Sequence, residues 1–194
     1  MMKKRIVRMI CVFAMGLMVI TAIPTDSYAA KKPTEQGKYP TRKGMILVTP
    51  QNANWLAKTI SVYKYIYTGE PLGHAGIVYS KSKTVEALKT VTKAENNWKK
   101  LKHVKRIYGL DVKKTNNTQD AKMADWCAKQ VGKKYNYNYA DVKTRKKFYC
   151  SHLIWAAWKD NYNINMNTWR YGAMVSPLEL AKSDKTNTIY IYSK

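Results

Sequence analysis

The chain has 194 residues and is strongly basic, with 35 Lys and Arg residues against 12 Asp and Glu and a formal net charge of +23. It contains only three cysteines, which excludes a small fold held together by several disulfides. No CxxC, HExxH or closely spaced His/Cys group is present, so we expect no dedicated zinc site.

The first 29 residues have the three-part pattern of a secretory signal peptide. A basic start within residues 1–8 precedes an apolar run, Met9–Ile23, that is short for a membrane span. Small residues at Ser27 and Ala29 predict cleavage after Ala29. We therefore expect a secreted, cell-wall-associated protein. Retention of the segment as a membrane anchor is the alternative.

Removal of residues 1–29 leaves 165 residues, a length that suits one domain, with a net charge of +20. This surplus predicts attraction to polyanions, weakened by salt. Outside a cell, these are teichoic-acid-like wall polymers, anionic lipid headgroups and stray nucleic acid; we expect no specific nucleic acid and at most peripheral membrane contact. Lysines cluster at 99–106 and 143–147, which favours binding, although solubilisation alone is the alternative.

Apolar patterning predicts mixed strands and helices after a flexible lead-in at residues 30–42. The predicted strands, each bounded by turn residues, are 44–48, 74–79, 84–88, 104–112 and 188–192. The predicted helices are 54–65, 121–131, 151–158 and one beginning at 176–179. Because strands and helices come in blocks without strict alternation, the sequence indicates an α+β fold in one domain, residues 43–194.

Cys150 is the candidate nucleophile, although by its position it can also be a small buried residue on the helix face that includes Leu153, Ile154 and Ala157. Its place at the very start of a predicted helix favours a nucleophile. Unpaired backbone N–H groups and the positive end of the helix dipole stabilise a thiolate there. Cys127 lies mid-helix and is interpreted as a core residue, while a Cys127–Cys150 disulfide remains open and would exclude the nucleophile.

A nucleophilic cysteine needs a base, and the chain has three histidines. His152 lies two residues after Cys150 on the same helix, so the two side chains diverge. His103 lies within a lysine cluster, whereas His74 begins an apolar strand at the edge of the core. If strands 74–79 and 84–88 form a hairpin, Glu86 can hold Nδ1 of His74 while Nε2 faces the cysteine. An exposed strand charge is the alternative for Glu86.

Six segments carry a family resemblance: GMILV (44–48), GHAGIVY (73–79), VEAL (85–88), VGKKYNYNY (131–139), YCSHLIWAAW (149–158) and SPLELAKS (176–183). In this order they resemble the permuted NlpC-type papain-fold cysteine hydrolases of bacteria, the YiiX/YaeF group. The histidine strand precedes the cysteine helix in that group, as it does here. The sequence departs from the family pattern at Met45, where an Asp is usual, and at Lys134, where a Pro is usual.

The resemblance implies a circularly permuted papain-like fold with an antiparallel sheet packed against helices. It also implies Cys150 as nucleophile, His74 as base and then acid, Glu86 as orienting residue and Tyr135 as a substrate-binding residue. Cleavage of amide bonds by acyl transfer is then expected, without metal or organic cofactor. Peptidoglycan stem peptides are the expected substrate. The alternatives are lipid or small aminoacyl amides and esters, a non-catalytic wall-binding module, and a purely structural protein.

Overall fold

The computed structural model describes residues 32–50, 73–170 and 172–194. The helix predicted at 54–65 lies outside the described residues. The strands are β1 (Thr34–Gly37), β2 (Ile46–Thr49), β3 (His74–Ser80), β4 (Lys83–Ala87), β5 (Val91–Glu95), β6 (Arg106–Val112), β7 (Lys134–Tyr135), β8 (Lys147–Phe148) and β9 (Thr186–Ser193). The helices are a 3-10 turn η1 (Trp98–Lys100), α2 (Asn117–Ala128), α3 (Cys150–Tyr162) and α4 (Pro177–Lys182).

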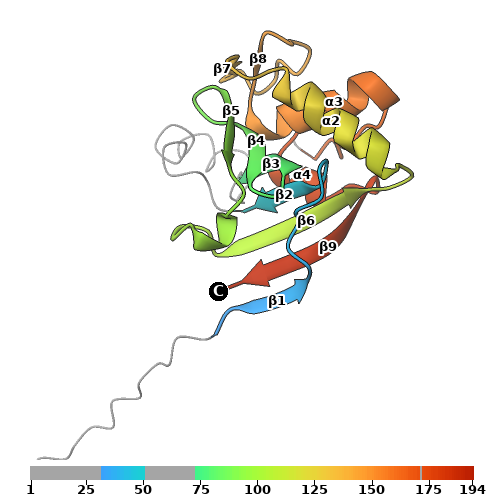
Figure 1. Cartoon of the computed structure of the whole chain (residues 1–194). Helices are drawn as coiled ribbons and strands as arrows, with labels where there is room; N and C mark the ends of the chain where they lie inside the picture. Colours follow the sequence, from blue (N-terminus) through green and yellow to red (C-terminus); the bar gives the residue numbers. More distant parts are fainter. Residues whose placement is uncertain (1–31, 51–72, 171) are drawn as a thin grey trace, which may run out of the picture. The chain divides into compact units, whose positions relative to one another are not determined.

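Seven strands form one antiparallel sheet in the order β1-β9-β6-β2-β3-β4-β5, and β7 and β8 form a separate parallel pair (Figure 1). The predicted hairpin is confirmed, because β3 pairs with β4 and Gly76 lies opposite Glu86. The expected α+β architecture, an antiparallel sheet with a few helices, is confirmed as well.

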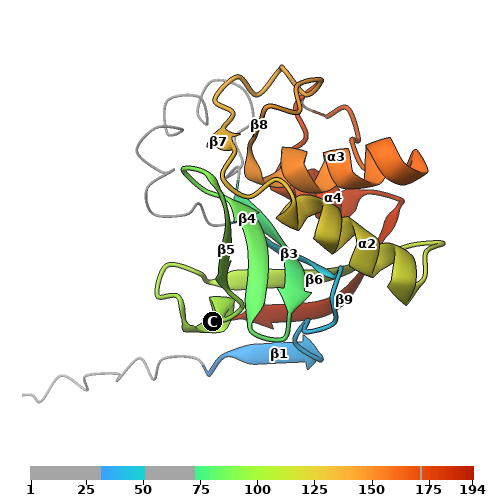
Figure 2. The same cartoon turned by 45° about the horizontal axis from the view of Figure 1, so that its top comes forward.

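The two faces of the sheet bury different sets of residues. Helices α2 and α3 pack on one face, against β3 and β4 (Figure 2). Ala75 and Ile77 belong to the core on this helix side, whereas Val78 belongs to a smaller cluster on the opposite side with Trp98. Because side chains alternate along a strand, the His74 side chain projects to the same side of the sheet as Val78 and Trp98.

Local capping explains where two of the helices begin. The Asn116 side chain accepts a hydrogen bond from the Gln119 N–H, and the Gln119 side chain accepts one from the Asn116 N–H. This capping box starts α2 four residues earlier than the apolar spacing predicts. Ser176 and Glu179 form the same box at α4, followed by Pro177 at the first helical position, as the sequence predicts.

Two features differ from the sequence predictions. Residues 30–42, expected to be a flexible lead-in, include strand β1, and Arg42 forms ion pairs with Asp111 and Asp120. Strand β5 and the two-residue strands β7 and β8 were not predicted, because their lysines and short length hide the alternation of a strand. Within the described ranges, no helix is long and apolar enough to cross a membrane.

Candidate active site

Cys150 is the first residue of α3 and is buried. The preceding residue, Tyr149, is the N-cap, and its side chain makes no capping hydrogen bond. The first-turn N–H groups of α3 therefore have no capping oxygen and face the region of the thiol. Both Cys127 and Cys150 are free, so the disulfide that would have excluded a nucleophile is not formed.

His74 and Glu86 meet on neighbouring strands. The Glu86 side chain extends from β4 across Gly76 of β3, and its Oε2 lies 2.7 Å from Nε2 of His74. Both side chains are buried. The predicted partnership is therefore present but uses the other ring nitrogen: Glu86 holds Nε2, not Nδ1. Nδ1 is buried and makes no hydrogen bond of normal geometry among the described residues.

Two glycines leave space for this arrangement. A Cβ on Gly76 would lie 2.9 Å from Cγ of Glu86 and 3.1 Å from the indole ring of Trp98, so only glycine lets the carboxylate cross the strand. Gly73 has a φ of +72°, and a Cβ there would lie 2.2 Å from the carbonyl oxygen of Thr49. Gly73 thus sets the path by which the chain enters β3 at His74.

The two candidate catalytic groups favour their charged forms. Burial alone would raise the pKa of Cys150, but His74 and the backbone N–H groups of Ala75 and Ser151 lower it below the usual thiol value. Burial alone would lower the pKa of His74, but Cys150 and Glu86 raise it above the usual value. Burial opposes ionisation of Glu86 as well, yet the hydrogen bond from His74 lowers its pKa. These shifts favour a thiolate at Cys150, an imidazolium at His74 and a carboxylate at Glu86.

A narrow cavity of about 20 Å³, room for about one water molecule, opens beside Cys150. Its described lining is Gly73, Tyr135, Tyr139, Tyr149, Cys150, Ser151, Met174, Val175, Ser176 and Pro177. We call it the Cys150 slot. Most of the lining is aromatic or aliphatic, so the slot favours an apolar group beside the thiol.

Hydrogen bonds tie one wall of the slot to the start of α3. The Val175 N–H donates to the hydroxyl of Tyr149, and the Ser151 hydroxyl donates to the carbonyl of Val175. The structure thus places Tyr135, the predicted substrate-binding residue, and this wall around the predicted nucleophile. Burial raises the pKa of Tyr135 well above the usual value, so its hydroxyl keeps its proton.

A sequence model of one protein family matches residues 43–190, and that family is described as the permuted papain-like amidase enzymes of the YaeF/YiiX type, C92 family. The chain belongs to this family. It is also similar to the crystal structure of the metalloprotein yiiX from Escherichia coli O157:H7, with a TM-score of 0.60 and 17% sequence identity. That match covers 78% of this chain and 97% of the other, and at this identity it supports the fold alone. No protein with a curated description matches the chain significantly.

Membership in the YaeF/YiiX family confirms the family and the permuted papain-like fold predicted from the six segments. It also supports a papain-like amidase or cysteine hydrolase as the general class of activity. The roles of Cys150, His74, Glu86 and Tyr135 remain predictions, to which the geometry above gives a physical basis.

Trp98 completes the surroundings of Glu86 in this YaeF/YiiX-family protein and was missed in the sequence. Its indole N–H donates to Oε1 of Glu86 at 3.0 Å, and its ring stacks on His74 with centroids 5.3 Å apart. The hydroxyl of Thr84 donates to the same carboxylate oxygen. Trp98 directly precedes the lysine cluster at 99–106, whose charge drew the interpretation toward surface binding. No local signal connects it with His74, which lies 24 positions away.

We expect Trp98→Phe to lower turnover about tenfold, since a hydrogen bond to a charged group contributes about 1.5–3 kcal/mol. Phenylalanine keeps a ring over His74 but leaves Oε1 of Glu86 without the indole donor. The pKa of His74 should fall and that of Cys150 should rise, so the pH–rate profile narrows from both sides. Trp158→Phe is the matched control, because Trp158 is fully buried in α3 and its indole nitrogen has no described partner. An unchanged profile in Trp98→Phe would contradict the positioning role.

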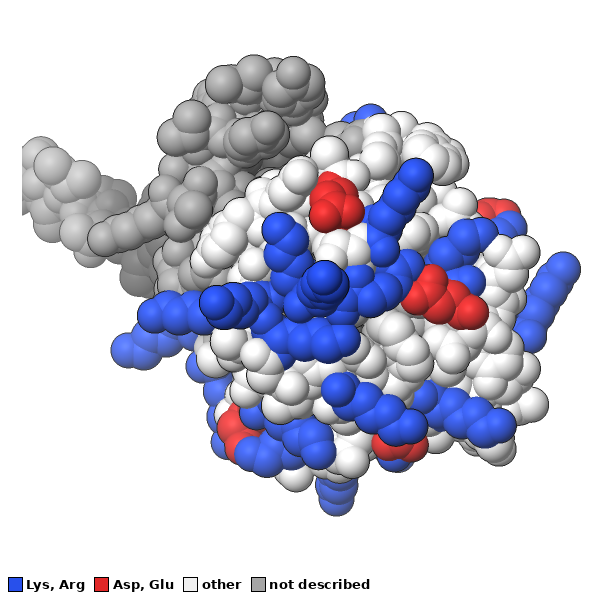
Figure 3. All heavy atoms as spheres, turned by 90° about the horizontal axis from the view of Figure 1, so that it is seen from above, with Lys and Arg blue, Asp and Glu red and all other residues white. Residues whose placement is uncertain are grey.

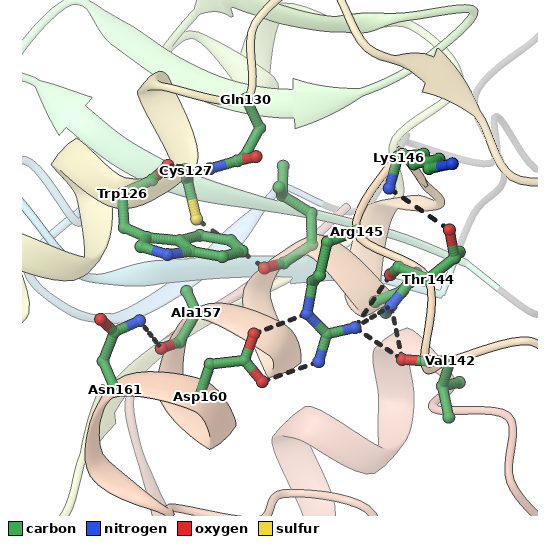
Figure 4. Close-up of polar contacts among 12 residues, drawn as sticks. Trp126, Cys127, Gln130, Val142, Thr144, Arg145, Lys146, Ala157, Asp160 and Asn161 are labelled. Carbon is green, nitrogen blue, oxygen red and sulfur yellow. Dashed lines mark hydrogen bonds and ion pairs between the residues drawn. The ribbon is translucent and has the colours of Figure 1, made fainter.

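His152 does not join the site, whereas His103 lines a second cavity together with His74, Glu86 and Trp98. His152 is buried behind Cys150 on α3, where its Nε2 lies 3.0 Å from the carbonyl of Val142, and burial together with Arg145 lowers its pKa to about 4. Arg145 also binds Asp160 through two nitrogens and donates to the carbonyls of Val142 and Thr144 (Figure 4). This network fixes the loop before β8 and thereby the approach of the chain to Cys150. Burial lowers the pKa of His103.

No group of three or more His, Cys, Asp or Glu side chains that could hold a metal ion occurs within residues 32–50, 73–170 and 172–194.

Proposed function

We propose that the protein is a secreted cysteine hydrolase that cleaves amide bonds by acyl transfer through Cys150, His74 and Glu86. The observation that carries this proposal is the buried row of three groups: a thiol at a helix N-terminus with a lowered pKa, a histidine with a raised pKa, and a carboxylate 2.7 Å from that histidine. Such a row is what nucleophilic catalysis by a cysteine requires.

The proposed reaction has two steps, formation of a thioester on Cys150 and its hydrolysis by water. The Cys150 thiolate attacks the substrate carbonyl carbon, and the N–H groups at the start of α3 stabilise the oxyanion that forms. Protonated Nδ1 of His74 gives its proton to the departing amine, leaving a thioester on Cys150. Neutral His74 then takes a proton from water, which hydrolyses the thioester and regenerates the thiolate–imidazolium pair. The protonated hydroxyl of Tyr135, in the lining of the slot, is the candidate second donor to the oxyanion.

Glu86 holds the imidazole by its Nε2 throughout these steps, so that Nδ1 is the nitrogen left to exchange protons. Its negative charge stabilises the imidazolium more than the neutral ring. Trp98 and Thr84 in turn keep Oε1 of this carboxylate occupied. Glu86 therefore acts through His74 and needs no contact with the substrate.

Peptidoglycan stem peptides are the proposed substrate. The signal pattern at residues 1–29 supports export to the wall, and the basic surface supports retention near anionic wall polymers. A second candidate is a lipid amide or ester. The largely apolar lining of the Cys150 slot favours this alternative, because it suits an apolar acyl group beside the reacting carbonyl.

The similar yiiX protein is described as a metalloprotein. Among the described residues of this chain, no three His, Cys, Asp or Glu side chains are arranged to hold a metal ion.

Mass spectrometry of digests tests the substrate. Purified peptidoglycan incubated with the full-length protein should release peptide fragments with a new carboxyl group at one amide position, and Cys150→Ala protein should release none. A fatty-acyl amide offered in the same way tests the second candidate. Cleavage of the lipid amide alone would replace the wall substrate by the lipid one. Equal cleavage by wild-type and Cys150→Ala protein would overturn the nucleophile assignment.

A further inference from the structure

Three chain segments that lie side by side next to the site carry basic and no acidic residues. They are 88–91, 132–136 and 144–149, which contain five lysines and one arginine. Backbone contacts join them in a row: Thr90 bridges to Lys134, and Lys134 pairs with Lys147 between β7 and β8. Figure 3 shows Lys and Arg side chains gathered on the face that is seen from above in Figure 1, where β7 and β8 lie.

The β7–β8 pair separates this charge from the site. Tyr135 and Phe148 are register partners and are buried, and Tyr135 lines the Cys150 slot. Lys134 and Lys147 are the other register partners and therefore project to the opposite, outer side. Together with the exposed Lys89 and Lys146 we call them the β7–β8 lysine surface.

Nothing described neutralises these four ammonium groups. Arg145, in the same segments, is paired with Asp160, and Lys133 donates to two uncharged oxygens and lies over the Phe148 ring. No ion pair within the described residues involves Lys89, Lys134, Lys146 or Lys147. Like charges directly opposite each other on paired strands are destabilising, so the Lys134–Lys147 pair is a cost that a bound anion would offset.

We propose that the β7–β8 lysine surface binds a linear phosphodiester polymer and so holds the proposed hydrolase on its anionic matrix, an inference that rests on the proposed function. Neighbouring strands lie about 4.8 Å apart, so the row of lysines presents positive charges at the short intervals of such a chain. A flexible polymer is favoured over a membrane, because Val91, Tyr135, Phe148 and Tyr149 in these segments are buried and Leu88 is half-buried. The three segments therefore offer little apolar surface to insert between lipids.

The test measures binding of full-length Cys150→Ala protein to long-chain inorganic polyphosphate as a function of salt. Replacing Lys89, Lys134, Lys146 and Lys147 by Gln should weaken binding at least tenfold and lower the slope of log K against log salt by roughly 2–3, about 0.7 per lost cation. The matched control replaces four other exposed lysines by Gln, namely Lys81, Lys102, Lys113 and Lys114. This control removes the same total charge and should change the slope by less than 1.

Equal effects of the two fourfold variants would overturn the proposal, because binding would then follow net charge and not this surface. Binding to vesicles of anionic lipid without binding to polyphosphate would overturn it in favour of a membrane. A second protein carries the same four Lys→Gln replacements but retains Cys150. Its Cys150 should be alkylated at the wild-type rate, and this result would show that the replacements leave the site folded. Since the binding assay uses protein without the thiol, a failure of the hydrolase proposal leaves its outcome unaffected.

Discussion

Replacing Cys150 or His74 by Ala is expected to lower kcat/KM at least about 1,000-fold in each case, and the double replacement should lower it little further. The two groups share one proton and one ion pair, so either loss disables both. Steady-state rates of the two single variants and the double variant on the best substrate found measure this coupling. Glu86→Gln should lose less, because it removes the charge beside Nε2 and leaves the Cys150–His74 pair in place.

Cys127→Ala is the control for cysteine loss. Cys127 is fully buried, its sulfur contacts the carbonyl of Leu153, and burial raises its pKa above the usual thiol value. Its replacement should reduce stability and leave turnover unchanged. Full activity in Cys150→Ala, or losses from Cys150→Ala and His74→Ala that multiply in the double variant, would refute a catalytic pair.

The rate of Cys150 alkylation by iodoacetamide is expected to fall less steeply from about pH 8 to about pH 6 than that of an ordinary thiol. An ordinary thiol, with a pKa of about 8.5, loses close to 100-fold in thiolate over the same interval. This weak pH dependence follows from the two pKa shifts. The lowered pKa of Cys150 keeps the thiolate at lower pH, and the raised pKa of His74 keeps the imidazolium at higher pH. Mass spectrometry of peptides distinguishes Cys150 from Cys127.

His74→Ala provides the contrast for the alkylation experiment. Without the imidazolium, burial dominates and raises the pKa of Cys150, so alkylation should slow steeply as the pH falls. The surrounding tyrosines do not titrate in this interval, since burial raises the pKa of Tyr139 to about 12 and that of Tyr149 and Tyr135 as well. A wild-type profile that falls as steeply as that of His74→Ala would contradict the thiolate–imidazolium pair.

Most of the candidate site could be predicted because its elements have strong local signals. The apolar run from Cys150 with its amphipathic spacing predicts α3, and the Ser176–Glu179 box predicts α4. The hairpin between β3 and β4 needs only a short turn, so its register brings Glu86 to His74 by local pairing alone. Family resemblance then supplied the one long-range relation, between His74 and Cys150.

The missed features depend on contacts between distant segments. Trp98 reaches Glu86 and His74 only after η1 folds over the sheet, and nothing in its neighbourhood of lysines indicates this. The choice of ring nitrogen depends on the angle at which the Glu86 side chain crosses Gly76. Strands β7 and β8 have two residues each, too few for an alternating pattern to be recognised.

The pairing of β1 with β9 brings the two ends of the described chain together, with Thr34 opposite Ser193. A short peptide would join these ends without disturbing the sheet, and the exposed loop at Tyr137 and Asn138 offers a place to open the chain. The rearranged polypeptide would run from the nucleophile to its base, the reverse of the present order. The site thus depends on the proximity of Cys150 and His74 in space and not on which of them comes first in the chain.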